Sequence, residues 1–357
     1  MADYKEIKGV KIQSTLEDPS GTNLYNGQVW FNATSGNLKY RREEVAAVGG
    51  SWTSGGSMNQ NVRNNASANV GTQTAALNFT GMISPSNTPT PVSGPTQKTS
   101  VVTEEYDGSA WTTQSNCSTD RQNAAGGGTQ TSGLLYGGLT NWPVQYTTAT
   151  EEYNGTSWGG GGSLPRGRYY MAGCGPQNAA FCFGGQVLGS PPAFFQTEAN
   201  DSNEYNGSSW SVGGTLAGSP TTGQTRTNSG AAGTQTAGLA FGGRDGAVKS
   251  TQHYDGTSWS LAANMINNAA FISSGMGTQT AALSVGAEPN TTQEYDGTSW
   301  IQGVTNPNNQ SSGGGAGTTS AAVIFGGYPP FPSTTTTSEY NGPITTGLRT
   351  GGTKFIT

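Results

Sequence analysis

Tyrosine and tryptophan recur along most of this chain at a fixed distance within short, otherwise polar segments. In five copies of one segment the two aromatic residues stand five positions apart, with an Asp-Gly or Asn-Gly pair directly after the tyrosine. Short β-prone runs on either side of such a pair predict a β-hairpin with a two-residue turn. The pairs are Tyr106 and Trp111, Tyr153 and Trp158, Tyr205 and Trp210, Tyr254 and Trp259, and Tyr295 and Trp300.

The first hairpin shows how the two aromatic residues are expected to lie. With a two-residue turn at the Asp-Gly pair, Tyr106 faces Ser109 and Glu104 faces Trp111 across the strands. Because side chains alternate along a strand, Tyr106 and Trp111 then share one face as diagonal neighbours. A single hairpin cannot bury such a face, so the hairpins are expected to stack in series.

Apolar residues also recur in a second segment, which begins with Gly-Thr-Gln-Thr or a variant of it. A large apolar residue stands eight positions after the first glycine in all six copies, and most copies end in Gly-Gly. This pattern predicts a second hairpin, in which a strand of small residues turns at Gln-Thr into an apolar strand. Thr80-Gly81 and Gly286-Ala287 depart from the closing Gly-Gly. The copies begin at Gly71, Gly128, Gly175, Gly233, Gly277 and Gly317.

Two hairpins per repeat give four strands, which is the content of one β-propeller blade. The Gly-Gly that closes the second strand, the tyrosine of the third and the tryptophan of the fourth resemble the kelch repeat. The resemblance covers roughly residues 50–343. It implies a kelch-like β-propeller, in which first strands rich in glycine and alanine crowd around the axis.

The number of repeats predicts how the ring closes. Six tryptophans match the six second hairpins, but Trp52 precedes the first of them, and no tryptophan follows Tyr340 in the last repeat. A strand around Trp52 is therefore expected to complete the sixth blade and to remove open sheet edges. The predicted fold is all-β: a six-bladed kelch-like β-propeller at residues 46–343, closed by an N-terminal strand and followed by a C-terminal tail at residues 344–357.

Residues 1–45 do not match the repeat and are predicted to form a separate module. A charged, extended lead runs to about residue 24, and the segment from Gly27 to Tyr40 is expected to form a small β-hairpin that turns near Ser35 and Gly36. The alternative is an N-terminal decoration without a role of its own.

Composition narrows the classes of function. Charged residues make up 10% of the chain, against about 25% in an average soluble domain. The net charge of −5 gives no basic footprint for a nucleic acid. No apolar run approaches the roughly 18 residues of a membrane span, and the first six residues lack the apolar region of a signal peptide.

Cysteine and histidine limit the chemistry. Cys117, Cys174 and Cys182 form no C-x-x-C pair, so buried free thiols are favoured over a disulfide, and a metal site comes last. His253 is the only histidine, which excludes His-dependent triads and multi-histidine metal sites. We expect neither a metal nor a cofactor.

Glutamate recurs before the tyrosine of the first hairpin type. Because these residues repeat, they are interpreted as architectural and not as the acid and base of one pocket. No catalytic residue is predicted, and the chain is not expected to be an enzyme. The residues assigned to this place in the third strand are Glu104, Glu152, Glu204, Glu294 and Glu339.

The segments between the second and third predicted strands of each repeat vary in length and sequence. In up-and-down blades these segments open on the same face as the blade-to-blade connections, so one face is variable and the other carries only repeated turns. Aromatic residues on the variable face can stack on sugar rings; the alternative is that each packs within its own loop. The candidates are Trp142, Tyr146, Phe194, Phe195, Tyr328 and Phe331.

Arginine recurs at the start of the predicted first strand in four repeats, seven or eight positions before the block glycine. Four guanidinium groups near one mouth of the ring can bind an anion. The favoured alternative is that these repeated polar residues join one blade to the next by hydrogen bonds. They are Arg63, Arg121, Arg168 and Arg226.

The beginning of the chain resembles a second group of proteins. Residues 1–9, residues 11–13 and above all residues 27–32 look like the start of structural proteins of tailed bacteriophages, notably marine ones, in which similar leads precede propellers with Tyr-Asp-Gly-Thr-Ser-Trp repeats. The resemblance implies a virion component, such as a tail fibre, spike or capsid decoration, made in the host cytoplasm. The candidate particle-attachment residues are Val29, Trp30 and Phe31.

A non-repeating lead followed by a ring with one variable face predicts a division of roles. The N-terminal module is expected to bind other virion proteins, and the variable face to bind a host-surface glycan or another receptor; a homo-oligomer is compatible with both. The alternatives are a purely structural bridge or decoration between virion subunits and a glycan-degrading enzyme.

Overall fold

The chain folds into β-strands that belong to two compact units. The computed structural model describes residues 13–16, 29–34, 36–40, 50–83, 98–140, 145–188, 196–218, 226–243, 249–267, 274–287, 291–308, 310–327, 333–342 and 354–355. All regular elements of these residues are strands, which confirms the all-β class. One unit consists of residues 50–342, and the other of residues 1–49 with residues 343–357.

The unit of residues 50–342 contains six antiparallel four-stranded sheets, numbered here 1 to 6 along the chain. Sheet 1 contains β5 (Ala66–Ser67), β6 (Ala76–Phe79), β9 (Thr103–Tyr106) and β10 (Trp111–Gln114). Sheet 2 contains β11 (Ala125–Thr129), β12 (Ser132–Tyr136), β15 (Thr150–Tyr153) and β16 (Trp158–Gly160). Sheet 3 contains β18 (Ala172–Cys174), β19 (Phe181–Phe183), β22 (Asp201–Tyr205) and β23 (Trp210–Thr215).

The other three sheets repeat this order. Sheet 4 contains β24 (Gly230–Thr234), β25 (Ala237–Phe241), β26 (Thr251–Tyr254) and β27 (Trp259–Ala262). Sheet 5 contains β28 (Ser274–Thr278), β29 (Ala281–Ala287), β30 (Thr291–Tyr295) and β31 (Trp300–Gln302). Sheet 6 contains β32 (Gly314–Gly317), β33 (Ala321–Phe325) and β34 (Thr337–Asn341), and its fourth strand is β4 (Ser51–Ser54) from the start of the unit.

Three smaller pairings extend the sheets where the second strand leaves each of them. They are β7 (Met82–Ile83) with β8 (Lys98–Thr99), β13 (Leu139–Thr140) with β14 (Gln145–Tyr146), and β17 (Arg168–Tyr169) with β20 (Gln186–Leu188) and β21 (Gln196–Glu198).

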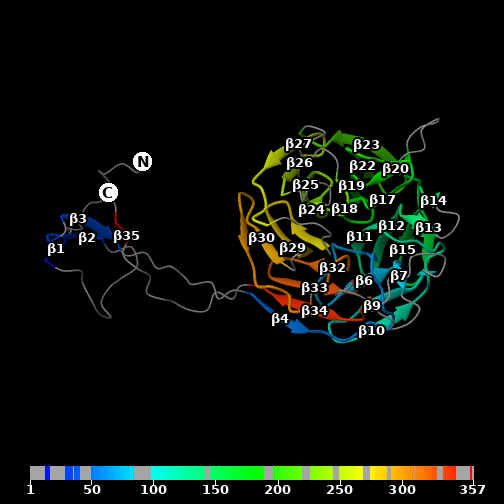
Figure 1. The fold of residues 1–357 in the computed structure, drawn as a ribbon, viewed down its shortest axis with the longest axis horizontal. Coiled ribbons are helices and arrows are strands. Elements are labelled where there is room, and N and C mark those ends of the chain that lie inside the picture. The colour runs from blue at the N-terminus through cyan, green and yellow to red at the C-terminus, as the bar shows by residue number, and fades with distance from the viewer. Residues whose placement is uncertain are drawn as a thin grey trace. The chain divides into compact units, whose positions relative to one another are not determined.

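The six sheets lie around a common centre, with the first strands innermost and the fourth strands toward the rim (Figure 1). The small residues of the first strands follow from this crowding. A Cβ atom on Gly126 of sheet 2 would lie 2.3 Å from the Ser67 carbonyl oxygen of sheet 1, and one on Gly275 of sheet 5 would lie 2.6 Å from the Ala231 carbonyl oxygen of sheet 4. Such approaches are too close for any side chain, so glycine is required at both places.

The tyrosine–tryptophan hairpins form, but their register differs from the predicted one. Tyr106 pairs directly with Trp111, so four residues, not two, make the turn. The Asp107 carboxylate accepts hydrogen bonds from the Ser109 and Ala110 amides at 2.8 and 2.7 Å, and this closes the longer turn. The predicted two-residue turn was wrong because an Asx side chain can cap a turn as well as favour a tight one.

Neighbouring sheets pack through aromatic residues. In sheet 5 the Trp300 ring lies 5.0 Å from Phe241 of sheet 4, at an angle of 60°. Its indole N–H donates to Thr251 Oγ1 of sheet 4 at 2.8 Å, so both the apolar body and the polar edge of the side chain are satisfied. Four further tryptophans donate to a hydroxyl of the preceding sheet in the same way, namely Trp111, Trp158, Trp210 and Trp259.

The glutamine of the Gly-Thr-Gln-Thr segment joins one sheet to the next. The amide of Gln177 in sheet 3 donates to the carbonyl oxygens of Gly133 and Tyr153 in sheet 2, both at 2.8 Å. The turn itself lies at Gln130 and Thr131 in sheet 2, as predicted, because Thr129 pairs with Ser132. The glutamines with equivalent bonds are Gln73, Gln130, Gln235 and Gln279.

The unit of residues 1–49 and 343–357 contains one four-stranded sheet. The predicted hairpin of β2 (Val29–Asn32) and β3 (Asn37–Tyr40) is present. β1 (Gln13–Thr15) lies parallel to β2, and β35 (Lys354–Phe355) is antiparallel to β3. Two segments read from the sequence as an extended lead and a C-terminal tail thus add strands to this sheet, because a backbone edge can pair with almost any sequence.

The three thiols are free and buried, as expected from the sequence. Burial raises the pKa of Cys117 and Cys182 to about 12, so both remain protonated at neutral pH.

Candidate functional site

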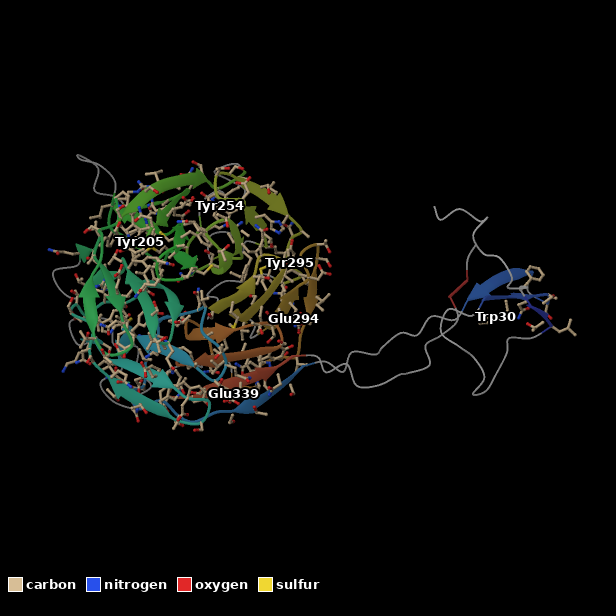
Figure 2. The ribbon with its side chains drawn as sticks, turned by 180° about the vertical axis from the view of Figure 1, so that it is seen from behind. Trp30, Tyr205, Tyr254, Glu294, Tyr295 and Glu339 are labelled. Carbon is tan, nitrogen blue, oxygen red and sulfur yellow. The ribbon has the colours of Figure 1, made fainter. Side chains whose placement is uncertain are left out.

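A circuit of hydrogen bonds between third strands joins the six sheets of residues 50–342. In sheet 3 the Tyr205 hydroxyl donates to the Glu152 carboxylate of sheet 2 at 2.6 Å, and desolvation together with this carboxylate raises the tyrosine pKa to about 12. Several members of the circuit are labelled in Figure 2. The other pairs are Tyr106 with Glu339, Tyr153 with Glu105, Tyr254 with Glu204, Tyr340 with Glu294, and Tyr295 with His253.

The circuit corrects one residue of the predicted glutamate set. Glu105, and not Glu104, occupies the place of Glu152, because Glu105 bonds to Tyr153 while the Glu104 carboxylate accepts from the Asn59 amide at 2.8 Å. The repeated glutamates therefore bond sheet to sheet, in keeping with their interpretation as architectural.

Three of the four predicted arginines are fully buried and bonded to their own sheets. Arg226 donates to the carbonyl oxygens of Gly242 and Ser250, both at 2.9 Å, and burial lowers its pKa to about 10. The guanidinium groups of Arg121 and Arg168 donate in the same way and pair with Glu151 and Asp201. Their Nη donors face carbonyl and carboxylate oxygens inside the protein, which does not support their predicted role as anion ligands. The buried Nε atoms of Arg168 and Arg226 have no partner among the described residues.

Arg63 does not belong to this set. A backbone bond identifies the equivalent residue in sheet 1. A glycine amide of the preceding sheet donates to the carbonyl oxygen of each buried arginine, namely Arg121, Arg168 and Arg226. In sheet 1 the Val62 carbonyl accepts this bond, from the Gly327 amide at 2.8 Å. Val62 is buried, whereas Arg63 is half-buried one position later and pairs with Met82 through its backbone. Spacing alone misplaced Arg63, because the segment before Gly71 is two residues longer in sheet 1.

In sheet 6 the place of the buried arginines is taken by Gln310, whose amide donates to the carbonyl oxygens of Gly326 and Thr336. Two positions beyond each of these residues the backbone enters the left-handed region, with φ between 50° and 56° in sheets 1, 2, 3, 4 and 6. These residues form what we call the collar. Four of these amides donate to the carbonyl of the preceding collar residue: Asn64 to Ser312 at 2.7 Å, and then Asn123 to Asn64, Tyr170 to Asn123 and Asn228 to Tyr170, each at 3.0 Å. The counterpart in sheet 5 falls within residues 268–273, outside the described part of the chain.

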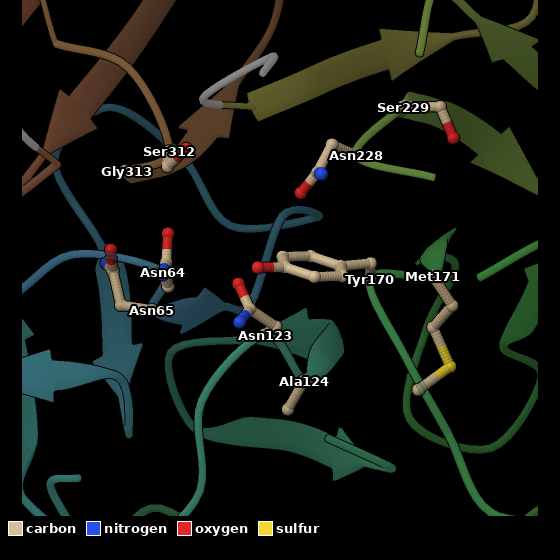
Figure 3. Close-up of a pocket in the computed structure, with 10 residues that line it drawn as sticks. All are labelled: Asn64, Asn65, Asn123, Ala124, Tyr170, Met171, Asn228, Ser229, Ser312 and Gly313. Carbon is tan, nitrogen blue, oxygen red and sulfur yellow. The ribbon is translucent and has the colours of Figure 1, made fainter. Parts of the chain in front are cut away.

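The collar surrounds a polar cavity of about 100 Å³, the collar pocket (Figure 3). It continues toward the first strands into a space of about 90 Å³, since Asn65, Ala124, Met171, Ser229 and Gly313 line both. The described lining residues carry no charged side chain. They are Asn64, Asn65, Asn123, Ala124, Tyr170, Met171, Asn228, Ser229, Ser312 and Gly313.

Three polar atoms of the lining are buried without a hydrogen-bond partner. They are Asn65 Oδ1, Asn228 Nδ2 and Ser229 Oγ. Such atoms are costly unless a bound molecule satisfies them. The pocket thus presents one acceptor, one donor and one hydroxyl that can act as either.

Tyr170 is the one aromatic residue among the described collar residues, and its ring lies across the lining in Figure 3. It packs against Tyr169 with ring centres 4.5 Å apart, and Tyr169 packs against Tyr146 at 4.6 Å. Tyr169 is buried, and its hydroxyl donates to Gln186 at 2.5 Å. Tyr146, predicted as a ligand residue, therefore packs within its own part of the protein and supports the tyrosine at the pocket.

The collar lies on the variable face. A first strand begins at the same end of a sheet at which the antiparallel second strand ends, so the collar shares this end with the variable segments. Backbone bonds join the two: Leu139, which follows the second strand of sheet 2, and Gln122, which precedes its first strand, exchange bonds of 2.9 and 3.0 Å. We call this end of the unit the loop face.

The remaining predicted site residues are aromatic residues of the variable segments and the attachment residues of the N-terminal sheet. Trp142, Phe194, Phe195, Tyr328 and Phe331 lie outside the described residues. In the N-terminal sheet Trp30 is buried and Phe31 is 37% exposed, whereas the Val29 side chain lies outside the described part. Of the predicted attachment residues, Phe31 is the one shown to be accessible.

Sequence reasoning did not find the collar. The collar residues share a backbone conformation and not a residue type, so no single amino acid repeats at this position. They are Asn64, Asn123, Tyr170, Asn228 and Ser312. A signal exists nonetheless: asparagine, which tolerates positive φ, stands two positions after the buried arginine in sheets 2 and 4.

The described residues hold no group of three or more His, Cys, Asp or Glu side chains placed to bind a metal ion. No helix long and apolar enough to cross a membrane is found among them.

Comparison with known proteins leaves the fold as the shared feature. No family model and no curated protein matches the chain. A solved structure titled "Structure of YjhT" matches with a TM-score of 0.57 and 11% sequence identity, over 79% of this chain and 95% of that one. At this identity the likeness concerns the fold alone, and this chain shares the all-β architecture of that structure.

Proposed function

We propose that this chain is a structural protein of a tailed-bacteriophage virion and that its loop face binds a glycan on the host surface. The observation that carries the proposal is the contrast between the two faces of residues 50–342. The loop face holds the variable segments and the collar pocket with its unpaired polar atoms, whereas the other face carries the repeated turns. Binding sites favour irregular loops on a rigid scaffold.

The scaffold we propose is a closed six-bladed kelch-like propeller, with sheets 1 to 6 as its blades. Sheet 6 supports this proposal, because its fourth strand is β4 (Ser51–Ser54) from the start of the unit. Sheet 6 bonds to sheet 5 through the Trp52 indole and the Val304 carbonyl at 2.8 Å. It bonds to sheet 1 through Ser67 Oγ and the Gly315 carbonyl at 3.1 Å. A ring of sheets in which the last sheet bonds to the first leaves no open sheet edge.

Attachment to the particle is assigned to the unit that contains both ends of the chain. Phe31 is accessible there, and an exposed aromatic residue is a common anchor at protein interfaces. In this proposal other virion proteins bind this unit, and the propeller stays free for the host surface.

For the loop face we propose binding and not catalysis, since the described residues that line the collar pocket include neither a carboxylate nor a histidine. Hydrolysis of a glycosidic bond usually needs two carboxyl groups on either side of that bond.

Binding of the purified full-length protein to a panel of bacterial isolates tests the proposal. Gln145→Arg places a large charge on the loop face, and Thr131→Arg places the same charge on the turn face; both positions are exposed. We expect saturable binding that Gln145→Arg weakens and Thr131→Arg leaves unchanged. Binding lost through Thr131→Arg alone, or binding to no isolate, would contradict the proposal.

A bridging or decorating role is the second candidate, and one observation favours it. The rim of sheets 3, 4 and 5 exposes Val212, Leu261 and Ile301, which are 70%, 63% and 51% accessible. Exposed apolar side chains on neighbouring outer strands are typical of protein contacts. If this role holds, replacing the three by threonine should lower incorporation of the protein into particles without affecting binding to cells.

A further inference from the structure

We propose that the collar pocket is a subsite for an uncharged sugar, with Tyr170 stacking on the sugar ring and the unpaired atoms of the pocket lining bonding its hydroxyl groups. This inference rests on the proposed glycan-binding function and specifies its chemistry. It depends on four observations: the backbone of Tyr170, the support of its ring, the unpaired atoms and the size of the pocket.

The backbone of Tyr170 is the first observation. Its φ of 56° is left-handed, a conformation that asparagine adopts readily and a bulky aromatic residue does not. The equivalent residues of sheets 1, 2 and 4 are asparagine, which fits this backbone with less strain. A strained residue that differs from its counterparts and lies at a pocket points to a functional role.

The support of the ring is the second observation. Tyr169 packs against Tyr170 and Tyr146 packs against Tyr169, with the rings tilted by 37° and 34°, and Gln186 fixes the Tyr169 hydroxyl. A ring held in this way loses little further conformational entropy when a ligand stacks on it. Tyr169 and Tyr146 act as positioning residues in this arrangement.

The unpaired atoms define the ligand class. Asn228 Nδ2 donates, Asn65 Oδ1 accepts and Ser229 Oγ does both, which matches neighbouring hydroxyl groups of a sugar. A carboxylate or sulfate would lose hydration here without gaining a cation. Arg121 and Arg168, two positions before Asn123 and Tyr170, do not line the pocket, and their Nη atoms are already bonded inside their sheets.

The size of the pocket shows how much of the ligand enters. A volume of about 100 Å³ holds roughly three water molecules, whereas whole ligands occupy pockets of about 300 Å³ or more. One hydroxylated edge of a sugar therefore enters the pocket, and the rest of the glycan lies across the loop face.

The test measures binding of the full-length protein to an array of neutral and acidic glycans. Tyr170→Asn introduces the residue of three other sheets, so folding should be retained and the melting temperature should be equal or higher. Binding to neutral glycans should fall about tenfold. Tyr170→Phe keeps the ring and should keep most of the affinity.

Two further variants complete the design. Asn228→Gly keeps the positive φ and removes the amide donor, so it should weaken neutral glycan binding several-fold. Ile301→Thr, on the exposed rim, is the control and should bind as the unmodified protein does.

The outcomes separate this inference from the function on which it rests. Glycan binding that Tyr170→Asn leaves unchanged, or a preference for acidic glycans, overturns the inference and leaves the function standing. A protein that binds bacterial cells but no glycan on the array overturns the inference and redirects the function to another receptor. A protein that binds neither overturns both.

Discussion

At the scale of single residues, backbone conformation explains why a glycine follows the second strand in most sheets. The first glycine of the closing Gly-Gly has a φ between 62° and 78° in sheets 2 to 6. In sheet 1 the same place holds Thr80, with a φ of 58°, a fully buried side chain and a hydroxyl without a partner. A β-branched residue is poorly suited to this conformation, so Thr80 is a local weak point.

Replacing Thr80 by glycine should therefore stabilise the protein. Relief of left-handed strain and of the unpaired hydroxyl should outweigh the entropy that glycine adds to the unfolded chain, for a net gain of about 1 kcal/mol in the free energy of unfolding. Urea denaturation measures the change. The matched variant Gly184→Ala, whose Cβ would lie 2.4 Å from the Arg226 carbonyl oxygen, should lose about 2 kcal/mol or more. A Thr80→Gly variant less stable than the parent would contradict this interpretation.

At the scale of elements, the aromatic hairpin depends on an Asx side chain in its turn. Asp255 accepts from the Thr257 and Ser258 amides at 2.8 Å, and these bonds hold its pKa below the usual range. Asn154 and Asn206 make the same contacts in sheets 2 and 3. The side-chain oxygen, and not the charge, is thus the shared requirement.

Asp255→Asn should fold with little change at pH 7 and should alter the response to acid. The depressed pKa of Asp255 contributes stability that is present above the unfolded value of about 3.9 and is lost as the pH falls toward the folded value. The asparagine variant should lack this contribution and lose less stability below about pH 4. Thermal melts of both proteins at pH 7 and pH 3 provide the comparison. Equal losses in acid would show that the carboxylate is not bound in this way.

The elements were largely predictable, but the register of the aromatic hairpins was not. Repeated Gly-Thr-Gln-Thr and Tyr-to-Trp spacings located the strands, because each repeat buries the same faces. The pairing of Tyr106 with Trp111 was missed because turn length depends on the Asp107 cap. Arg63 was misplaced by a local change in length, and β35 has no sequence signal, since edge pairing uses backbone atoms.

At the scale of the whole molecule, the tyrosine circuit links the six sheets of residues 50–342. Five of its bonds end on a glutamate, and the sixth joins the Tyr295 hydroxyl and His253 Nε2 at 2.9 Å. Hydrogen bonds to charged groups are stronger than those between neutral groups, so the bond between Tyr295 and His253 is the weakest of the six.

Tyr205→Phe should cost more stability than Tyr295→Phe. The first leaves the Glu152 carboxylate without its tyrosine donor and should cost about 2 kcal/mol, whereas the second should cost about 1 kcal/mol. Chemical denaturation of the two variants measures the difference. Equal losses would indicate that the charge of Glu152 adds nothing to the bond.

The same circuit predicts sensitivity to alkaline pH. The pKa values of Tyr106, Tyr205 and Tyr254 are raised to about 12, from about 10 in the unfolded chain. A raised pKa contributes stability that is complete below about pH 10 and is lost as the pH rises toward 12. The denaturation midpoint should therefore decrease when the pH is raised from 9 to 11. The decrease should be smaller in Tyr205→Phe than in the parent protein. A midpoint that does not change over this range would contradict the assignment.

The collar, the tyrosine circuit and the loop face all depend on the proposed closure of the ring by β4, which one cross-linking measurement tests directly. Ser51 and Asn341 are paired across β4 and β34, at a separation that a disulfide can bridge. The double cysteine variant at these two positions should form an intramolecular disulfide under mild oxidation and melt at a higher temperature than its reduced form. The control pair, cysteines at Ser54 and Asn341, is out of register and should not cross-link. Failure of the first pair to cross-link within one chain, or equal cross-linking of both pairs, would contradict the closed ring.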